Sequence, residues 1–358
     1  MKTLLGMLLA LTVVASPSGG PVMATPRAAH TATLLESGEV LIAGGCTLNS
    51  CELDDRGRTT ELFDPDTGRF RAGPPLLRPR VGHAAVRLHD GSVLVAGGWG
   101  ASEPTATAEL YDPGRGFSRL PPMTTPRGAF TATLLPDGRV LIAGGTNGDR
   151  TLRRAELFDP RSRTFRPTGS MHVGRSAHAA APLRGGRVLV TGGSVGERAL
   201  ASAEIYDPRT GRFARTRAMT LPRHKHAAVQ LRGGGVLVVG GSSGAESSGA
   251  DYTGRYASAE LYDPRRGRFE RVGRMLERRF KLPDAVVRLR SGRVVVAGGG
   301  RRVELYEPSR RQFRVAGQTG VALSFSTATA LRDGRVLVVG GYDDRIAVTN
   351  RAWMISPP

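Results

Sequence analysis

The amino-acid sequence predicts an all-β protein, a seven-bladed β-propeller whose blades each contain four antiparallel strands. Three observations predict this fold. A phrase such as Arg27–Gly45, which ends in Gly-Gly, occurs seven times along the 358-residue chain, the last two copies being weaker. Each copy contains two short apolar runs joined by a tight-turn signal, and a third run follows it. Outside the first residues of the chain there is no sustained helical period.

The spacing of the copies sets the number and size of the blades. The second glycines of the pairs are Gly45, Gly98, Gly145, Gly193, Gly241, Gly299 and Gly341, with spacings of 53, 47, 48, 48, 58 and 42 residues. A repeat near 50 residues is typical of a propeller in which each repeat supplies one small sheet. Such an array also suits the length of the chain better than one compact core does.

The second copy illustrates the four strands expected in a blade. His83–Leu88 and Val93–Ala96 form the first and second strands, with a turn signal between them. Ala108–Tyr111 forms the third strand and is followed by Asp-Pro, which ends it. Phe117 then opens the fourth strand.

The order of glycines and aromatic residues carries a family resemblance. Gly192-Gly193 is followed by Tyr206 and Phe213, and Gly240-Gly241 by Tyr262 and Phe269. The chain thereby resembles secreted kelch-repeat proteins of the galactose-oxidase-like propeller superfamily, although phenylalanine stands where the family usually has tryptophan. The resemblance implies the fold and little about activity, because the fold hosts both enzymes and binding modules.

The N-terminal region has the features of a secretory signal peptide. Lys2 precedes an apolar run from Leu4 to Val14, and small residues follow it. The run is too short to be a comfortable membrane span. We expect residues 1–15 to be a signal peptide and residues 16–358 to be one propeller domain. The mature protein is expected to be secreted or periplasmic, without a transmembrane segment, and a monomer.

The two cysteines lie in one loop. Cys46 and Cys51 are separated by four residues directly after the first Gly-Gly. In an oxidising compartment this arrangement favours a disulfide, and the residues between the two cysteines offer no further metal ligands. No metal and no cofactor is expected.

The two ends of the chain are expected to meet in the last blade. Ala352–Ile355 aligns with a third strand, and the chain ends before a fourth strand. Residues Ser18–Met23 are predicted to supply that strand, which would close the ring and cover an exposed sheet edge.

Arginine and glutamate recur at fixed repeat positions and are interpreted as structural ion pairs. The arginines are Arg27, Arg80, Arg127, Arg175 and Arg223, and the glutamates are Glu61, Glu109, Glu156, Glu204 and Glu260. In the sixth copy we expect Lys281 in place of the arginine, opposite Glu304. In the seventh both are lost, to Leu323 and Trp353.

A histidine also recurs, at His30, His83, His178 and His226. We interpret it as a hydrogen-bonded inner-strand position, replaced by Phe130, Asp284 and Ser326 in the other copies. His224 lies outside this set, where a ligand can reach it.

The basic composition leaves two interpretations open. The formal net charge is +20, and 48 of the 51 basic residues are arginines, since the only lysines are Lys2, Lys225 and Lys281. Codon drift accounts for this composition as readily as a polyanion surface does. Short arginine-rich turns share one face of the expected ring, and this face is a possible site for an anionic polymer.

The opposite face carries the loops after Gly-Gly, which vary in length and composition. Variable loops on a uniform scaffold are where binding specificity usually lies. We therefore expect a non-catalytic module that binds a protein or glycan there. The candidate ligand-binding residues are Trp99, His224, Tyr252, Tyr256, Tyr342, Asp343 and Asp344. The alternative for the long Ser- and Gly-rich loop Ser242–Gly254 is a simple flexible connection.

Two enzyme classes are alternatives. A sugar mutarotase or epimerase needs only an acid/base pair, for which Lys281 and Asp284 are candidates. A copper oxidase needs several converging ligands, which the sequence does not suggest. No catalytic residues are assigned.

Overall fold

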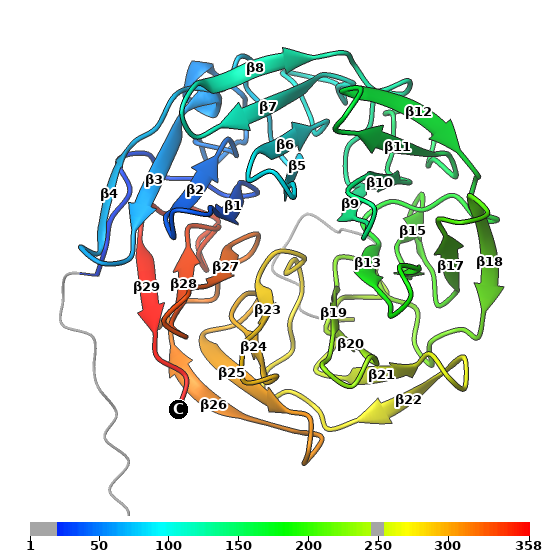
Figure 1. The fold of residues 1–358 in the computed structure, drawn as a ribbon. Coiled ribbons are helices and arrows are strands. Elements are labelled where there is room, and N and C mark those ends of the chain that lie inside the picture. The colour runs from blue at the N-terminus through cyan, green and yellow to red at the C-terminus, as the bar shows by residue number, and fades with distance from the viewer. Residues whose placement is uncertain (1–19, 245–253) are drawn as a thin grey trace, which may run out of the picture.

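Seven small sheets arranged around a central axis form a closed ring (Figure 1). The computed structural model describes residues 20–244 and 254–358, so the predicted signal peptide lies outside the described residues. No helix in the described ranges is long and apolar enough to cross a membrane. The all-β, seven-bladed prediction is confirmed.

The first three blades have the same four-stranded antiparallel order, with the first strand nearest the axis. Blade 1 contains β1 (Thr31–Leu34), β2 (Val40–Ala43), β3 (Thr60–Asp64) and β4 (Arg69–Ala72). Blade 2 contains β5 (Ala84–Arg87), β6 (Val93–Ala96), β7 (Ala108–Asp112) and β8 (Gly116–Leu120). Blade 3 contains β9 (Thr131–Leu134), β10 (Val140–Ala143), β11 (Ala155–Asp159) and β12 (Thr164–Thr168).

Blades 4 to 6 repeat this order. Blade 4 contains β13 (Ala179–Pro182), β14 (Val188–Thr191), β17 (Ala203–Asp207) and β18 (Arg212–Thr216), with β15 (Ser194–Val195) and β16 (Arg198–Ala199) as a small hairpin. Blade 5 contains β19 (Ala227–Gln230), β20 (Val236–Val239), β21 (Ala259–Asp263) and β22 (Arg268–Val272). Blade 6 contains β23 (Val286–Arg288), β24 (Val294–Val296), β25 (Arg302–Glu307) and β26 (Gln312–Gln318).

The seventh sheet joins the two ends of the described chain. It contains β27 (Thr327–Ala330), β28 (Val336–Val339) and β29 (Ala352–Ile355). Val22 forms an antiparallel bridge with Arg351, and the Ala352 N–H donates to the Pro21 carbonyl at 2.9 Å. The described part of the expected closing segment therefore lies beside β29 as one bridge. Ser18 lies outside the described residues, and a full fourth strand there stays a prediction.

Apolar residues between adjacent blades make up the core. Val140 and Ile142 of β10 pack with Leu94 of β6, for example, and all three are buried. In each of the first six blades an aromatic residue of the third strand contacts one of the fourth, as Tyr206 and Phe213 do with ring centroids 4.9 Å apart. These rings fill the space where the blades diverge from the axis.

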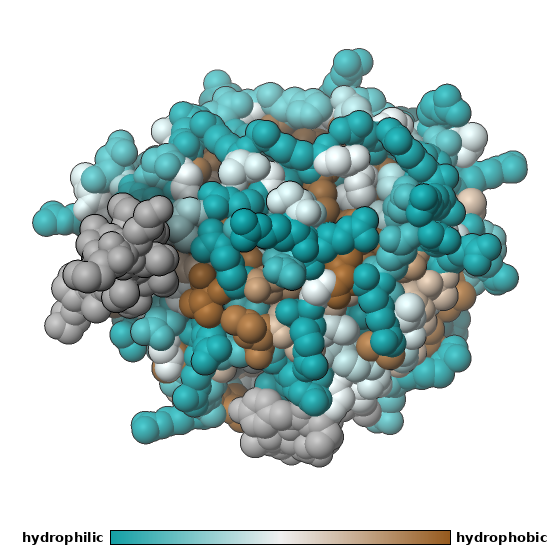
Figure 2. All heavy atoms as spheres, turned by 90° about the horizontal axis from the view of Figure 1, so that it is seen from below, coloured by the Kyte–Doolittle hydropathy of each residue, from teal (hydrophilic) through white to brown (hydrophobic). Residues whose placement is uncertain are grey.

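Antiparallel strand order gives the ring two different faces. The turn face carries the turns between first and second strands and between third and fourth strands. The loop face carries the segments after the Gly-Gly pairs, including the single 3-10 helix η1 (Asp55–Arg58) of the described chain. Hydrophilic side chains cover most of the wall of the ring in the view of Figure 2, with a smaller hydrophobic area near its centre.

Candidate functional site

Six arginine–glutamate pairs are buried between the loop face and the core. The nitrogen–oxygen distances run from 2.5 to 3.1 Å, and every arginine side chain in the pairs has no solvent exposure. The pairs are Arg27–Glu61, Arg80–Glu109, Arg127–Glu156, Arg175–Glu204, Arg223–Glu260 and Arg279–Glu304. Each arginine also donates to the carbonyl of the first glycine of its Gly-Gly, as Arg127 Nη1 does to Gly144 at 2.8 Å.

Each glutamate also accepts hydrogen bonds from backbone N–H groups of the segment that leads into its blade. Glu61 Oε2 accepts from the Ala24 N–H at 2.8 Å, and Glu204 Oε2 from the His172 N–H at 2.8 Å. Burial disfavours the charged form of Glu204, but the hydrogen bonds from His172 and Arg175 outweigh it and lower the pKa of the carboxyl. The pairs thus hold consecutive blades together, including the last to the first, and they belong to the scaffold.

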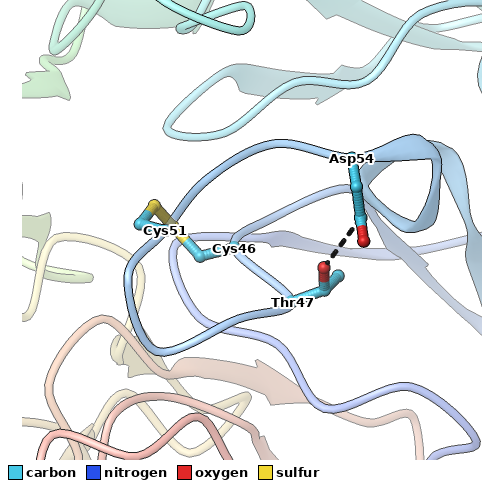
Figure 3. The surroundings of a disulfide bond; sticks show 4 residues. All are labelled: Cys46, Thr47, Cys51 and Asp54. Atoms are coloured by element: carbon cyan, nitrogen blue, oxygen red, sulfur yellow. Dashed lines mark hydrogen bonds between the residues drawn. A yellow bond between two sulfur atoms is a disulfide. The ribbon is translucent and has the colours of Figure 1, made fainter.

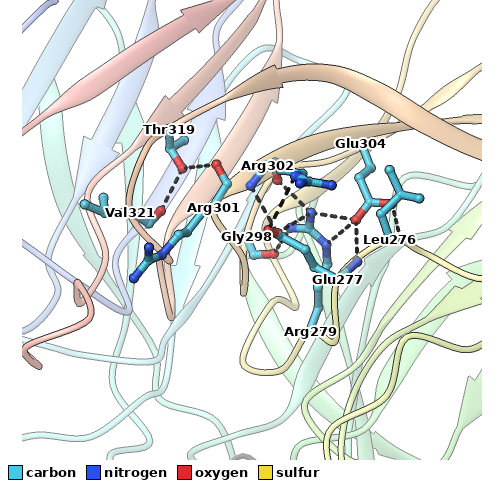
Figure 4. Close-up of polar contacts among 9 residues, drawn as sticks. All are labelled: Leu276, Glu277, Arg279, Gly298, Arg301, Arg302, Glu304, Thr319 and Val321. Carbon is cyan, nitrogen blue, oxygen red and sulfur yellow. Dashed lines mark hydrogen bonds and ion pairs between the residues drawn. The ribbon is translucent and has the colours of Figure 1, made fainter.

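The sixth pair corrects an expectation from the sequence. The partner of Glu304 is Arg279, at 2.8 Å, and not Lys281 (Figure 4). The same carboxylate accepts from the Leu276 and Glu277 N–H groups. Ala285 comes six positions after Arg279, whereas Thr31 comes four positions after Arg27 in blade 1. This two-residue insertion shifted the alignment.

The repeated histidines join neighbouring inner strands through hydroxyl groups. His83 Nε2 lies 3.0 Å from Thr31 Oγ1, and His178 Nε2 lies 2.9 Å from Thr131 Oγ1. His226 has Ala179 at the corresponding place in the preceding blade. Its Nε2 lies 2.9 Å from Oγ1 of Thr191 instead. Thr191 is the residue that pairs with Ala179 on the neighbouring strand.

Where neither residue of the equivalent strand pair in the preceding blade carries a hydroxyl, the histidine is absent. Phe130 follows a blade with Ala84 paired to Ala96. In blade 6 the position belongs to Leu282, which contacts the Cβ position of Gly240 as a histidine does elsewhere. The expectation that Asp284 stands there is wrong, again because of the insertion.

Burial keeps these histidines neutral. Loss of water, helped by the nearby Arg80, lowers the pKa of His83 to about 3. The same cause, with Arg175, lowers the pKa of His178 to about 3. A buried neutral imidazole bonded to a threonine is a structural group and leaves no site for a ligand.

The disulfide closes a small loop on the loop face. Cys46 and Cys51 are bonded to each other, and Thr47 Oγ1 donates to Asp54 Oδ1 at 3.3 Å in the same loop (Figure 3). Cys46 pairs with Ala28 as an isolated bridge. The clamp therefore shapes the first of the variable loops next to the inner strand.

A belt of backbone hydrogen bonds surrounds the channel mouth on the loop face. The residue two positions after each arginine has a positive φ, as in Ala177 (51°) and Lys225 (49°). The Lys225 N–H donates to the Ala177 carbonyl at 2.8 Å, and the Phe325 N–H to the Lys281 carbonyl at 2.8 Å. The residues at this belt position are Ala29, Gly82, Ala129, Ala177, Lys225, Lys281 and Phe325.

Four residues at or next to the belt lie together, a grouping that the sequence did not predict. Lys225 Nζ lies 5.4 Å from the ring centroid of Phe325 and 5.8 Å from that of Phe280. Lys281 Nζ lies 5.3 and 5.7 Å from the same two centroids. We call Lys225, Lys281, Phe280 and Phe325 the lysine–phenylalanine cluster. The only lysines after Lys2 thus share two rings.

The inserted residues of blade 6 lie beside this cluster. Pro283 and Asp284 are exposed, and the Asp284 carbonyl accepts from the Ala328 N–H at 2.8 Å. Protein surrounds the carboxyl although water reaches it, and the resulting desolvation raises its pKa to about 6.

Three of the predicted ligand-binding residues already have protein contacts. The Trp99 ring occupies the space that a side chain at Gly128 would need. The Tyr256 ring lies 5.3 Å from the Arg223 guanidinium carbon. His224 is buried, with its ring 5.3 Å from that of Phe280, so it supports the lysine–phenylalanine cluster from below the surface.

The remaining candidates lie in blade 7 or outside the described residues. Burial raises the pKa of Tyr342, which is half-buried. Asp343 accepts from the N–H groups of Arg345 and Ala347, and Asp344 pairs with Arg301 at 2.9 Å. These carboxylates shape the loop. Tyr252 lies outside the described residues.

Comparison with known proteins supports the fold. The model of the kelch motif matches residues 127–172 and 175–220, which are blades 3 and 4 with their connections. No curated protein matches the sequence. A solved fungal alcohol oxidase of the AA5 family, in complex with copper, has 18% sequence identity and a TM-score of 0.76. The match covers 95% of this chain and 76% of that one.

The similarity to a copper enzyme raises the question of whether the residues here fit copper. Four histidines bind threonines between blades, and both cysteines are used in the disulfide. No group of three or more His, Cys, Asp or Glu that can hold a metal occurs in the described ranges. The described histidines and cysteines therefore do not fit the donor set of a copper centre.

Solved structures of 1012 chains match this fold, so the fold alone does not define an activity. The sequence motif, the strand order and the bridge between the two chain ends all indicate the same propeller fold. The chain is a seven-bladed β-propeller, and its third and fourth blades match the kelch motif.

Proposed function

We propose that this protein is a secreted, non-catalytic binding module that holds a protein or glycan ligand on its loop face. The observation that carries the proposal is the lysine–phenylalanine cluster at the channel mouth. The ion pairs and the histidine–threonine contacts repeat around the ring with little change. Lys225, Lys281 and Phe325 instead break the repeat at adjacent belt positions, where three other blades have alanine.

The cluster offers two kinds of contact. The partly exposed Phe325 ring, beside the buried Phe280, provides flat apolar surface for a sugar face or an apolar side chain. The two ammonium groups provide donors and positive charge for a carboxylate or another acidic group. A ligand that presents an apolar surface next to an acidic group matches both, whether it is a protein segment or an acidic glycan.

Secretion fits the same proposal. The disulfide is favoured in an oxidising compartment, and the sequence before residue 16 has the form of a signal peptide. Edman sequencing of the exported protein should find a new N-terminus near Ala15. Recovery of the intact chain from the cytoplasm only would refute export.

Replacement of the lysines by alanine tests the binding site with little risk to the fold. Alanine is the natural residue at this position in Ala29, Ala129 and Ala177, with a similar positive φ. Lys225→Ala/Lys281→Ala should keep the melting temperature of the parent protein. It should weaken binding to the ligand found by a glycan array or by pull-down with the mature protein, by about tenfold or more.

The control for this test is Arg161→Ser/Arg209→Ser, which removes two exposed charges from the turn face. If both double variants weaken binding equally, net charge and not the cluster is responsible. If only the control weakens binding, the ligand does not use the loop face.

A sugar mutarotase is the second candidate, because the pKa of Asp284 is raised to about 6. A carboxyl that titrates near neutral pH is suited to general acid–base catalysis. Lys281, the other predicted member of the pair, is a belt residue of the same blade. NMR measurement of the exchange between sugar anomers should show no catalysis if the protein only binds. Exchange that is fast in the parent and slow in Asp284→Asn would favour the enzyme.

A further inference from the structure

A groove on the turn face lies between blades 5 and 6. It has a volume of about 1040 Å³ and is formed by the β19–β20, β21–β22, β23–β24 and β25–β26 turns. We call it the 5/6 groove. Its residues are separate from the lysine–phenylalanine cluster, which lies on the loop face.

The 5/6 groove is strongly basic. Seven arginines and three acidic residues line it, a net of four positive charges. The arginines are Arg232, Arg265, Arg266, Arg293, Arg310, Arg311 and Arg314. The acidic residues are Asp263, Glu270 and Glu307, and each lies within 4.0 Å of an arginine nitrogen.

The acidic residues organise the groove without neutralising it. Glu270 accepts from Arg268 at 2.8 Å and lies 3.7 Å from Arg311, so it joins the two blades across the groove. Glu307 accepts from Arg314 at 2.8 Å. Arg265 and Arg232 have no acidic side chain within 4.0 Å in the described parts of the chain, and both are exposed.

An equivalent groove between blades 3 and 4 provides an internal comparison. It has a volume of about 590 Å³ and is lined by two arginines and one aspartate, Arg139, Arg209 and Asp137. Its net charge is thus +1. Arginines make up a similar share of the two linings, so the 5/6 groove differs in its larger volume and in the larger number of charges that it brings together.

From charge complementarity and shape we propose that the 5/6 groove binds an acidic polysaccharide. Exposed guanidinium groups can each donate two hydrogen bonds to a sulfate or carboxylate. Tyr262 is the single aromatic residue among those lining the groove, and it is buried. Without an exposed ring on which bases can stack, the groove suits a sugar chain better than a single-stranded nucleic acid.

A further exposed arginine of blade 4 lies next to the groove on the turn face. Arg184 Nη2 donates to the Arg232 carbonyl at 2.7 Å, and Arg232 packs against Gly292 of the next blade. A polymer that leaves the groove at Arg232 therefore meets Arg184 next. Several repeat units of a polyanion can contact the face at once, which favours a polymer over a single anion.

The test measures binding of a heparin oligosaccharide to the mature protein at several salt concentrations. Arg265→Ser/Arg310→Ser should raise its Kd about tenfold, since each exposed charge contact contributes up to about 1 kcal/mol. The salt dependence of binding should also become weaker. Arg161→Ser/Arg209→Ser, which removes equal charge from the turns of blades 3 and 4, should change the Kd less than about twofold.

Other outcomes overturn the inference. Equal loss of affinity in the two double variants would mean that net charge and not the 5/6 groove binds heparin. No heparin binding by the parent protein, or tighter binding of a single-stranded DNA oligonucleotide, would also refute it. The binding of alginate, which carries carboxylates, and of neutral dextran should be measured in the same way. Alginate binding shows that carboxylates suffice, and dextran binding equal to that of heparin would exclude an electrostatic site.

Discussion

At the scale of single residues, the structure separates groups that build the ring from groups that are free to vary. Each arginine of the six pairs is fully buried and contacts both a carboxylate and a backbone carbonyl. The desolvation cost of such a pair is large, so loss of one partner costs more than loss of both. Stability measurements on single and double variants can therefore distinguish a structural pair from a functional one.

Arg127→Ala should lower the free energy of unfolding by about 3–5 kcal/mol, because Glu156 is left buried without its 2.5 Å partner. Arg127→Ala/Glu156→Ala should recover part of this loss. Chemical denaturation of the variants and of Arg209→Ser, an exposed control, measures the effect. An unchanged stability together with lost ligand binding would instead mark the arginines as a functional channel lining.

The buried histidines predict a specific pH dependence of stability. The pKa of His83 and of His178 is about 3 in the folded protein and about 6.5 as the ordinary value. Below pH 6.5 the unfolded chain takes up protons that the folded protein does not. Stability should therefore fall as the pH falls from about 6.5 to about 3, by up to about 1.4 kcal/mol per pH unit for each histidine.

A double variant that copies the natural arrangement at Phe130 tests this assignment. His83→Phe/Thr31→Ala reproduces the pairing of Phe130 with Ala84, which the protein itself tolerates. The slope of unfolding free energy against pH between 3 and 6.5 should become smaller in this double variant than in the parent. Equal slopes in the parent and the double variant would contradict the buried neutral state of His83.

At the scale of the strand and its connections, the second glycine of each Gly-Gly pair lets its segment pass close to the residues that enter the same blade. Gly193 has a φ of 89°, and a Cβ there would lie 2.6 Å from the Ser176 carbonyl. Gly185 has a φ of 80° and no atom within 4 Å of its Cβ position. Both glycines have a left-handed backbone, but only Gly185 has room for a side chain.

Gly185→Ala should cost about 1–2 kcal/mol from the left-handed backbone alone. Gly193→Ala should cost clearly more, because the backbone of blade 4 must also move. Thermal unfolding of both variants gives the comparison. Equal losses would mean that backbone conformation and not close packing accounts for the recurring glycine.

The Cys46–Cys51 clamp affects one loop and not the ring. Its closed loop is short, so Cys46→Ser/Cys51→Ser should cost less than the about 2–4 kcal/mol typical of disulfides. Mass spectrometry of the parent should find no free thiol. A collapse of the whole fold in the double variant would show that the clamp does more than shape the loop.

At the scale of the whole molecule, the sequence was sufficient for the scaffold. Repeats such as Gly192-Gly193 and Tyr206 mark equivalent places in each blade, so one blade predicts the others. The disulfide was predicted because Cys46 and Cys51 are close in the sequence. The meeting of the chain ends near Ala352 was predicted from the alignment of the last copy with a third strand.

Because the repeat positions were assigned by alignment, the sequence led to wrong assignments in blade 6. Because Pro283 and Asp284 are inserted, counting from the glycines assigned Lys281 the role of Arg279 and Asp284 the role of Leu282. The lysine–phenylalanine cluster joins residues from three blades, and no spacing within one repeat brings them together. The rarity of lysine was the one signal that could have revealed it.

The two proposed sites lie on opposite faces, so one comparison of variants addresses both without confusion. The most direct measurement uses the ligand found by glycan array or pull-down, with heparin and other polyanions present as competitors that occupy the 5/6 groove. Its affinity is measured for the parent, for Lys225→Ala/Lys281→Ala and for Arg265→Ser/Arg310→Ser. We predict that only the lysine variant loses affinity, with no change in melting temperature. Affinity that survives loss of both lysines but fails in the arginine variant would contradict a loop-face binding module.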